Sequence, residues 1–188
     1  MIPKAFNKSI WFLCLGGLLL LSFRTAGDPP RVWRAERPLT WEDFQGQPDF
    51  RSEKTAYTKS RIKSKWSYTG DKLTYKVYAI FEPSNSWARK PKTDHLLAHE
   101  QLHFDITEAY ARMLRREFAR IEDPETMGSD GIKAITRGVR EEWHRRQKEF
   151  DRETDHSVNE EAEARWRAEI KAMLESMSDY STVVGSNK

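Results

Sequence analysis

DHLLAHEQLHFDITEAYARMLRREFARI, residues 94–121, predicts one long helix, and this helix decides the fold around it. Thr93 or Asp94 can cap its start, and Asp123-Pro124 breaks the pattern after it. Apolar side chains recur at helical spacing along one face, which therefore points to a core. They are Ile106, Tyr110, Met113 and Leu114. His99 and His103 continue this face, so the helix brings two imidazoles to the end of a buried seam.

The motif HEQLH, residues 99–103, has the spacing of a metal site. Residues four apart lie on one helical face, so both imidazoles can bind one ion at about 2.0–2.1 Å from each nitrogen. Glu100 points about 100° further round the helix, where it would reach a metal-bound water instead of the metal. Zinc lowers the pKa of such a water towards about 7, and a carboxylate can take its proton. We therefore expect Zn²⁺ held by His99 and His103, with Glu100 as the catalytic base.

The rival interpretation of HEQLH is a helix that carries two histidines and no metal. It is disfavoured because both imidazoles point towards the core side of the helix. A buried polar group without a partner is costly, and a bound metal would satisfy both rings.

A catalytic zinc ion also needs a third protein ligand and an open coordination position. We favour His156, because the sequence TDHS at residues 154–157 forms a joint between two predicted helices, and such a joint can aim a side chain at another element. Asp155 or Thr154 could hold the His156 ring in place. The alternative third ligand is an acid, above all Glu160 at the start of the next helix.

The other candidate ligands fit less well. His95 lies one turn before His99, and three ligands along one helix would splay too far. His144 lies in charged surroundings (EEWHRRQ) and is expected to be a partly exposed helix residue. Asp105 follows His103 by only two residues and faces another way, although it could orient a ligand. Glu108 is near in sequence only.

The chain before the long helix predicts a β-hairpin over residues 56–81. Side chains alternate between two faces along residues 56–68, a turn follows at 69–72, and the alternation resumes to residue 81. The outer face of the first strand is basic, with Lys59, Arg61, Lys63 and Lys65. Such a row is ordinarily a solvated face that protects the strand, and the alternative is a surface for an acidic partner.

Two further helices are expected after the long one, over residues 131–150 and 159–177. Each has an apolar stripe at helical spacing, and a capping box from Ser157 to Glu160 precedes the second. Residues 83–91 are expected to form a loop. Together these elements predict an α+β fold, zincin-like, in which a small antiparallel sheet packs on three main helices.

The first 27 residues predict a secretory signal. Lys4 and Lys8 precede an apolar run from Ile10 to Phe23, and small residues follow it before Asp28. An uncleaved anchor is the alternative, although the run is short for a membrane-spanning helix of about 20 residues. We expect a secreted or periplasmic protein that meets the membrane only through this segment if it is uncleaved. The remaining divisions are a linker at 28–38, the domain at 39–178 and a flexible tail at 179–188.

Composition narrows the class of protein and its partners. Mean hydropathy is −0.81, but seven tryptophans argue for a packed domain with a charged surface. The formal net charge of +3 is matched by the three basic residues of the first 27, so the domain itself is neutral and nucleic acid is not implied. The single cysteine, Cys14, lies in the same segment, so any metal in the domain must be held by His, Asp or Glu.

The sequence resembles a family of bacterial secreted proteins, a domain of unknown function described as predicted zinc-dependent proteases. The resemblance covers about Leu39 to Ile170. It is carried by LTWEDFQGQPD, AHEQLHFDITEAYARMLRRE and FDRETDHSVNEEAEARW. The resemblance implies His99 and His103 as ligands, Glu100 as base and His156 as third ligand. The family's last block usually reads Thr-x-His-Gly, and Ser157 stands here in place of that glycine.

The expected function is zinc-dependent hydrolysis of peptide bonds in a peptide or protein substrate outside the cytoplasm. The hairpin could pair with an extended substrate by β-addition. An oxyanion donor is also needed, and the candidates are Tyr57, Tyr75, Tyr110 and His144. The alternatives are a non-enzymatic, zinc-stabilised envelope module, with Glu160 or Asp155 completing a closed shell, and an amidase acting on cell-wall peptides.

Overall fold

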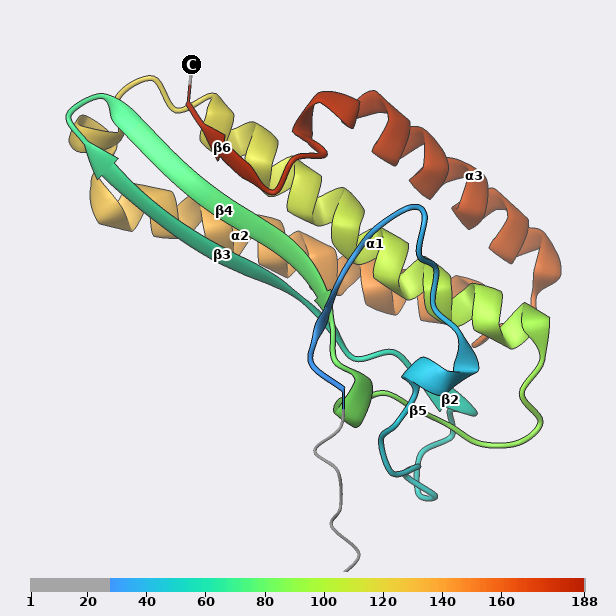
Figure 1. The fold of residues 1–188 in the computed structure, drawn as a ribbon. Helices are drawn as coiled ribbons and strands as arrows, with labels where there is room; N and C mark the ends of the chain where they lie inside the picture. The colour runs from blue at the N-terminus through green and yellow to red at the C-terminus, as the bar shows by residue number, and fades with distance from the viewer. Residues whose placement is uncertain (1–27, 188) are drawn as a thin grey trace, which may run out of the picture.

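The computed structural model describes residues 28–187 (Figure 1). Residues 1–27, for which the sequence predicts a secretory signal, lie outside the described residues. Among residues 28–187, no helix combines the length and the apolar character needed to cross a bilayer.

The long helix α1, Asp94–Ala119, is the centre of the fold (Figure 1). The Thr93 side chain caps it by accepting a hydrogen bond from the backbone N–H of Leu96 at 3.1 Å. α1 packs against strand β4 and against helices α2 and α3, and Ile106 and Leu114 on its apolar face are fully buried. The predicted α+β class, with a small antiparallel sheet on three helices, is confirmed.

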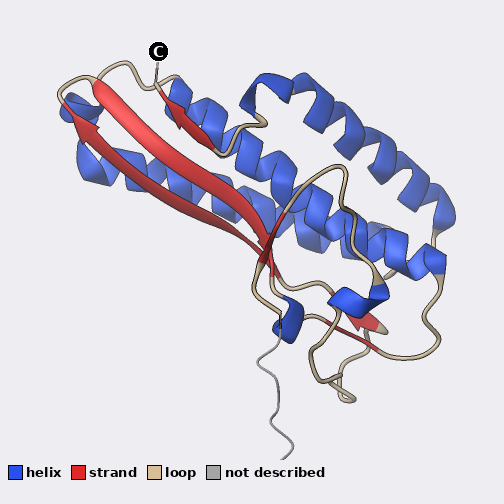
Figure 2. Cartoon of the chain, viewed as in Figure 1, coloured by secondary structure: helices blue, strands red, loops and turns tan. Residues whose placement is uncertain are grey.

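The main sheet is built on a hairpin of β3, Ser60–Thr69, and β4, Lys72–Phe81 (Figure 2). The strands pair in antiparallel register from Ser60 opposite Phe81 to Thr69 opposite Lys72. Gly70 turns the chain with a φ of 56°, a left-handed conformation that glycine adopts without steric cost. Alternate residues of β4 point into the core, and they are Leu73, Tyr75, Val77, Ala79 and Phe81.

The prediction of one continuous strand from residue 56 to 68 is wrong. β2, Ala56–Tyr57, pairs with β5, Trp87–Ala88, in a second small sheet. Between β2 and β3, the Thr58 hydroxyl donates to the carbonyl of Glu100 at 3.1 Å, and the Lys59 N–H donates to the Ser86 hydroxyl. The alternation of buried and exposed side chains runs through this break, so the sequence pattern does not reveal it. The expected loop at 83–91 thus contains a 3₁₀ turn, Pro83–Asn85, as well as β5.

Helix α2, Pro124–Glu153, is longer than the predicted 131–150 at both ends. The helix has a kink near its start, where Gly128 has a φ of 68°. At the other end, α2 continues one turn past Phe150, which places Asp151 on the helix. Helix α3, Glu160–Ser176, is capped by Asn159, whose side chain accepts from the Ala162 N–H, and not by the capping box at Ser157.

The expected linker and flexible tail both add strands to the main sheet. β1, Arg31–Val32, pairs with β4 at Phe81 and Ile80, and β6, Val184–Ser186, pairs with β4 at Thr74 to Lys76. Since β3 occupies one edge of β4, the other edge needs hydrogen-bond partners, and these two segments supply them. Short 3₁₀ turns at Trp41–Asp43 and Ser178–Tyr180 connect them to the body of the domain.

The α2–α3 joint is strained at three consecutive residues. Asp155, His156 and Ser157 have φ values of 48°, 52° and 82°, in the left-handed region that costs a residue with a side chain about 1–2 kcal/mol. Ser157 stands at the position where the resembling family has glycine.

Replacing Ser157 with glycine is expected to stabilise the protein by roughly 0.5–1 kcal/mol, since relief of strain outweighs the added entropy of the unfolded chain. Thermal unfolding should show a rise in Tm of about 2–4 °C. A matched Ser178→Gly variant has no such strain to relieve and should unfold at or below the temperature of the parent. A lower Tm for Ser157→Gly would show that the joint is not strained.

Candidate metal centre

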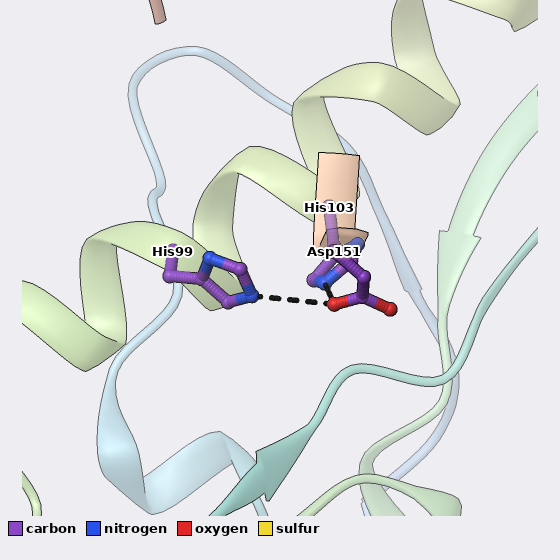
Figure 3. A group of neighbouring side chains, drawn as sticks. All are labelled: His99, His103 and Asp151. Atoms are coloured by element: carbon purple, nitrogen blue, oxygen red, sulfur yellow. Dashed lines mark hydrogen bonds and ion pairs between the residues drawn. The ribbon is translucent and has the colours of Figure 1, made fainter. Parts of the chain in front are cut away.

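Three side chains from two helices converge near the start of α1 and the end of α2 (Figure 3). His99 and His103 come from consecutive turns of α1, and Asp151 comes from the last turn of α2. The Nε2 atom of His103 lies 3.1 Å from Asp151 Oδ1, and that of His99 lies 3.5 Å from the same oxygen. The three ligand atoms all lie within 4.8 Å of one another.

The two nitrogen–oxygen separations fit a tetrahedral ion. Two ligand atoms that bind zinc at about 2.0–2.1 Å with a tetrahedral angle between them lie about 3.3–3.4 Å apart. The two nitrogen–oxygen distances, 3.1 and 3.5 Å, bracket that value. Two imidazole nitrogens and one carboxylate oxygen are also the donor types of a catalytic zinc site, with the fourth position left for water.

Hydrogen bonds on the far side of each ring leave the Nε2 atoms available. His99 Nδ1 lies 2.5 Å from the carboxylate of Glu163, and His103 Nδ1 lies 2.5 Å from the Gln147 side-chain oxygen. The Gln147 amide is oriented because its nitrogen donates to the carbonyl of His103 at 2.8 Å. Since both Nδ1 atoms face acceptors, a metal-bound ring would keep its proton on Nδ1 and offer the lone pair of Nε2 to the ion.

Two such lone pairs facing the Asp151 oxygen would require a positive charge between them. Burial lowers the pKa of His99, but the hydrogen bonds to Asp151 and Glu163 and the charge of Glu100 outweigh it and raise that pKa to about 9. Burial raises the pKa of Asp151, yet hydrogen bonds from His103, His99 and Lys54 hold it well below its usual range. A proton on His99 thus supplies the charge that a bound cation would supply.

Glu100 is buried beside this group, with 2% of its surface exposed. Within residues 28–187, its Oε2 atom has no hydrogen-bond partner, although it is fully enclosed. An unpartnered buried carboxylate oxygen is costly unless a ligand or water completes it. Glu100 also lines the cleft above the two histidines.

His156 lies at the rim of the site and not between the two helical histidines. Its Nδ1 is 3.3 Å from Asp151 Oδ1, its side chain is 47% exposed, and it lines the same cleft. The group of ligand atoms within 4.8 Å of one another consists of His99, His103 and Asp151. The structure therefore brings His156 to the acid that holds the other two histidines together.

The remaining sequence candidates face elsewhere. The His95 ring lies 2.7 Å from the carbonyl of Ser157, and Asp105 accepts hydrogen bonds from Trp33 and Gln101. Glu108 pairs with two buried arginines. Asp155 and Glu160 are exposed on the surface.

The cleft over the histidines has one wall from residues 54–60, which include β2, and another from α2. The Lys54 ammonium lies 2.5 Å from Asp151 Oδ2, the oxygen that does not face the histidines. Of the proposed oxyanion donors, Tyr57 and His144 line this cleft. Tyr75 and Tyr110 are buried in the core, where Tyr75 packs on Phe118 and Tyr110 donates to Glu142, so neither can serve.

Comparison with known families places the chain without assigning it an activity. A family described as a bacterial protein of unknown function (DUF922) matches residues 36–157, well over half of the chain, and the chain belongs to that family. No curated protein and no solved structure matches it. The matched region contains HEQLH, Asp151 and His156, and it ends before Glu163.

Proposed function

We propose that this protein is a zinc-dependent metallopeptidase that acts outside the cytoplasm through a zincin-like site. The observation that carries the proposal is the convergence of His99, His103 and Asp151 beside the buried, unpartnered carboxylate of Glu100. Two imidazoles, one carboxylate ligand and a free carboxylate are the parts that metal-assisted hydrolysis requires.

When bound, zinc would polarise the substrate carbonyl and lower the pKa of water towards about 7. His99, His103 and Asp151 would hold the ion. Glu100 would accept a proton from the attacking water at its free oxygen and return it to the leaving amine. Tyr57 or His144, on the cleft wall, would donate a hydrogen bond to the developing oxyanion. Export is supported by residues 1–27, with their basic start and short apolar run.

Removal of the metal tests this proposal directly. The exported protein should bind about one zinc ion and hydrolyse a casein substrate, and dialysis against a chelator should remove both zinc and activity. Zinc returned in stoichiometric amount should restore hydrolysis, whereas magnesium should not, since imidazole ligands suit zinc. A folded protein that contains no transition metal after purification in zinc would overturn the proposal.

Glu163 is expected to position His99 for the metal. Its buried carboxylate holds His99 Nδ1, and such partners set ring orientation and ligand basicity. Glu163→Gln should therefore lower zinc affinity by about 10-fold or more. Competition with a chromophoric chelator measures the change. Glu161→Gln is the matched control, because Glu161 is exposed on the same helix, and its zinc affinity should equal that of the parent.

A structural zinc site is the second candidate function. It is favoured by the position of His156, because a ring 3.3 Å from Asp151 Oδ1 could close the fourth coordination position. A closed shell would exclude the attacking water and leave the protein a zinc-stabilised binding module.

A further inference from the structure

The cleft over the candidate metal centre continues into a second cleft along α2. The second cleft runs between the edge of β3, at Ser64 and Trp66, and one face of α2. His144 lines both clefts and joins them. An extended chain that reaches Glu100 therefore has a path along α2 away from the metal centre.

Positive side chains line this path. We define the cationic groove as the cations grouped around His144, namely Lys59, Arg137, Arg140 and Lys148. Lys59 lies on the wall of the first cleft, and Arg137 and Arg140 lie on the second, which Lys133 and one acid, Glu141, also line. Lys148 follows His144 by one helical turn and lines an adjoining hollow with Asp151 and His156. All except Arg140 are exposed.

The cations of the groove lack acidic partners. Within residues 28–187, no carboxylate lies in ion-pair distance of Lys59, Arg137, Arg140 or Lys148, whereas many other arginines of the chain are paired. Arg140 instead donates to the carbonyl of Ile62, which fixes its charge at the edge of β3. Burial lowers the pKa of His144, and the nearby charges of Lys148, Lys59 and Arg140 lower it further, which shows that these cations share one region.

The groove is a local feature, since the domain after residue 27 has no net charge. The basic face expected on the first strand contributes only Lys59 to it. Arg61 pairs with Glu82, and Lys63 and Lys65 line neither cleft. A row of unpaired cations beside the candidate site favours a ligand with spaced negative charges.

We propose that the cationic groove binds an acidic segment of the peptide substrate, so that glutamate and aspartate side chains beside the scissile bond pair with Lys59, Arg137, Arg140 and Lys148. This inference rests on the proposed peptidase function and names its substrate class. The groove sets specificity through complementary charge and takes no part in bond cleavage.

Binding to the Glu100→Gln variant tests the proposal without requiring turnover. A fluorescein-labelled peptide of alternating alanine and glutamate, measured by anisotropy in low salt with zinc present, should bind at least about tenfold more tightly than its alanine–glutamine counterpart. The preference should shrink to about twofold at 0.5 M salt, where screening shortens the range of exposed charges. Lys59→Gln combined with Arg137→Gln should remove most of the preference.

The matched control is Lys63→Gln combined with Lys65→Gln, which removes the same charge from the same strand region outside both clefts and should keep the preference. Equal binding of the two peptides, an equal loss in the control, or equally tight binding of an oligothymidylate would each overturn the inference. If the protein prefers the acidic peptide but hydrolyses no peptide, the proposed binding in the cationic groove would stand and the proposed peptidase function would be rejected.

Discussion

Glu100→Gln is expected to lower kcat/KM for peptide hydrolysis by about 10²–10⁴-fold while bound zinc stays at the parental level. Glutamine has the shape of glutamate but cannot accept the proton of the attacking water. Glu100 is not among the three converging ligands, so its replacement leaves His99, His103 and Asp151 in place. The variant should also be at least as stable as the parent, because it removes a buried charge whose Oε2 has no partner.

Zinc content, thermal unfolding and hydrolysis of casein, measured on the same preparation, check this prediction. Glu117→Gln, at the far end of α1 and paired only with surface arginines, is the matched control and should keep full activity. A structural zinc site predicts instead that Glu100→Gln changes nothing beyond local stability. Cleavage of muropeptides without hydrolysis of casein would support the same mechanism but would identify the protein as an amidase.

Local periodicity explains which parts of the fold could be predicted from sequence. The side chains of α1 and of the hairpin repeat with the period of their own element, so burial on one face is visible in the residue types. β1 and β6 are different, because they join the sheet through backbone hydrogen bonds to β4. Such bonds leave no pattern in two or three residues, and both segments therefore look like linker and tail.

The candidate site likewise contains residues that the sequence predicts and residues that it does not. His99, Glu100 and His103 lie on one turn of one helix, so their spacing alone predicts their geometry. Asp151 and Glu163 come from other helices, and nothing local separates them from the other acids among the 29 of the chain. One signal was available for Asp151. With Gln147 and Trp143 it forms a four-residue repeat, which extends the inner face of α2 past Phe150.

Asp151→Ala is expected to lower zinc affinity by more than about 100-fold, beyond the effect of losing an outer hydrogen-bond partner. Asp151 Oδ1 faces both Nε2 atoms, at 3.1 and 3.5 Å. His156→Ala should cost less than about tenfold, because the ring is about half exposed and contacts the site through Asp151. Chelator competition on both variants gives the two affinities.

Comparing the two variants also decides which residue is the third ligand. The sequence favours His156, whereas the distances in the structure favour Asp151. The sequence favours His156 as third ligand because it lies at a joint that can direct a side chain towards another helix. In the structure, the joint directs the imidazole towards Asp151. Asp155→Ala is the control, since that exposed neighbour should leave zinc affinity unchanged. If His156→Ala releases zinc and Asp151→Ala retains it, the joint must bring the imidazole inward when metal binds. Comparable losses in both variants would mean that both side chains bind the ion, and the closed, non-catalytic site would then become the better assignment.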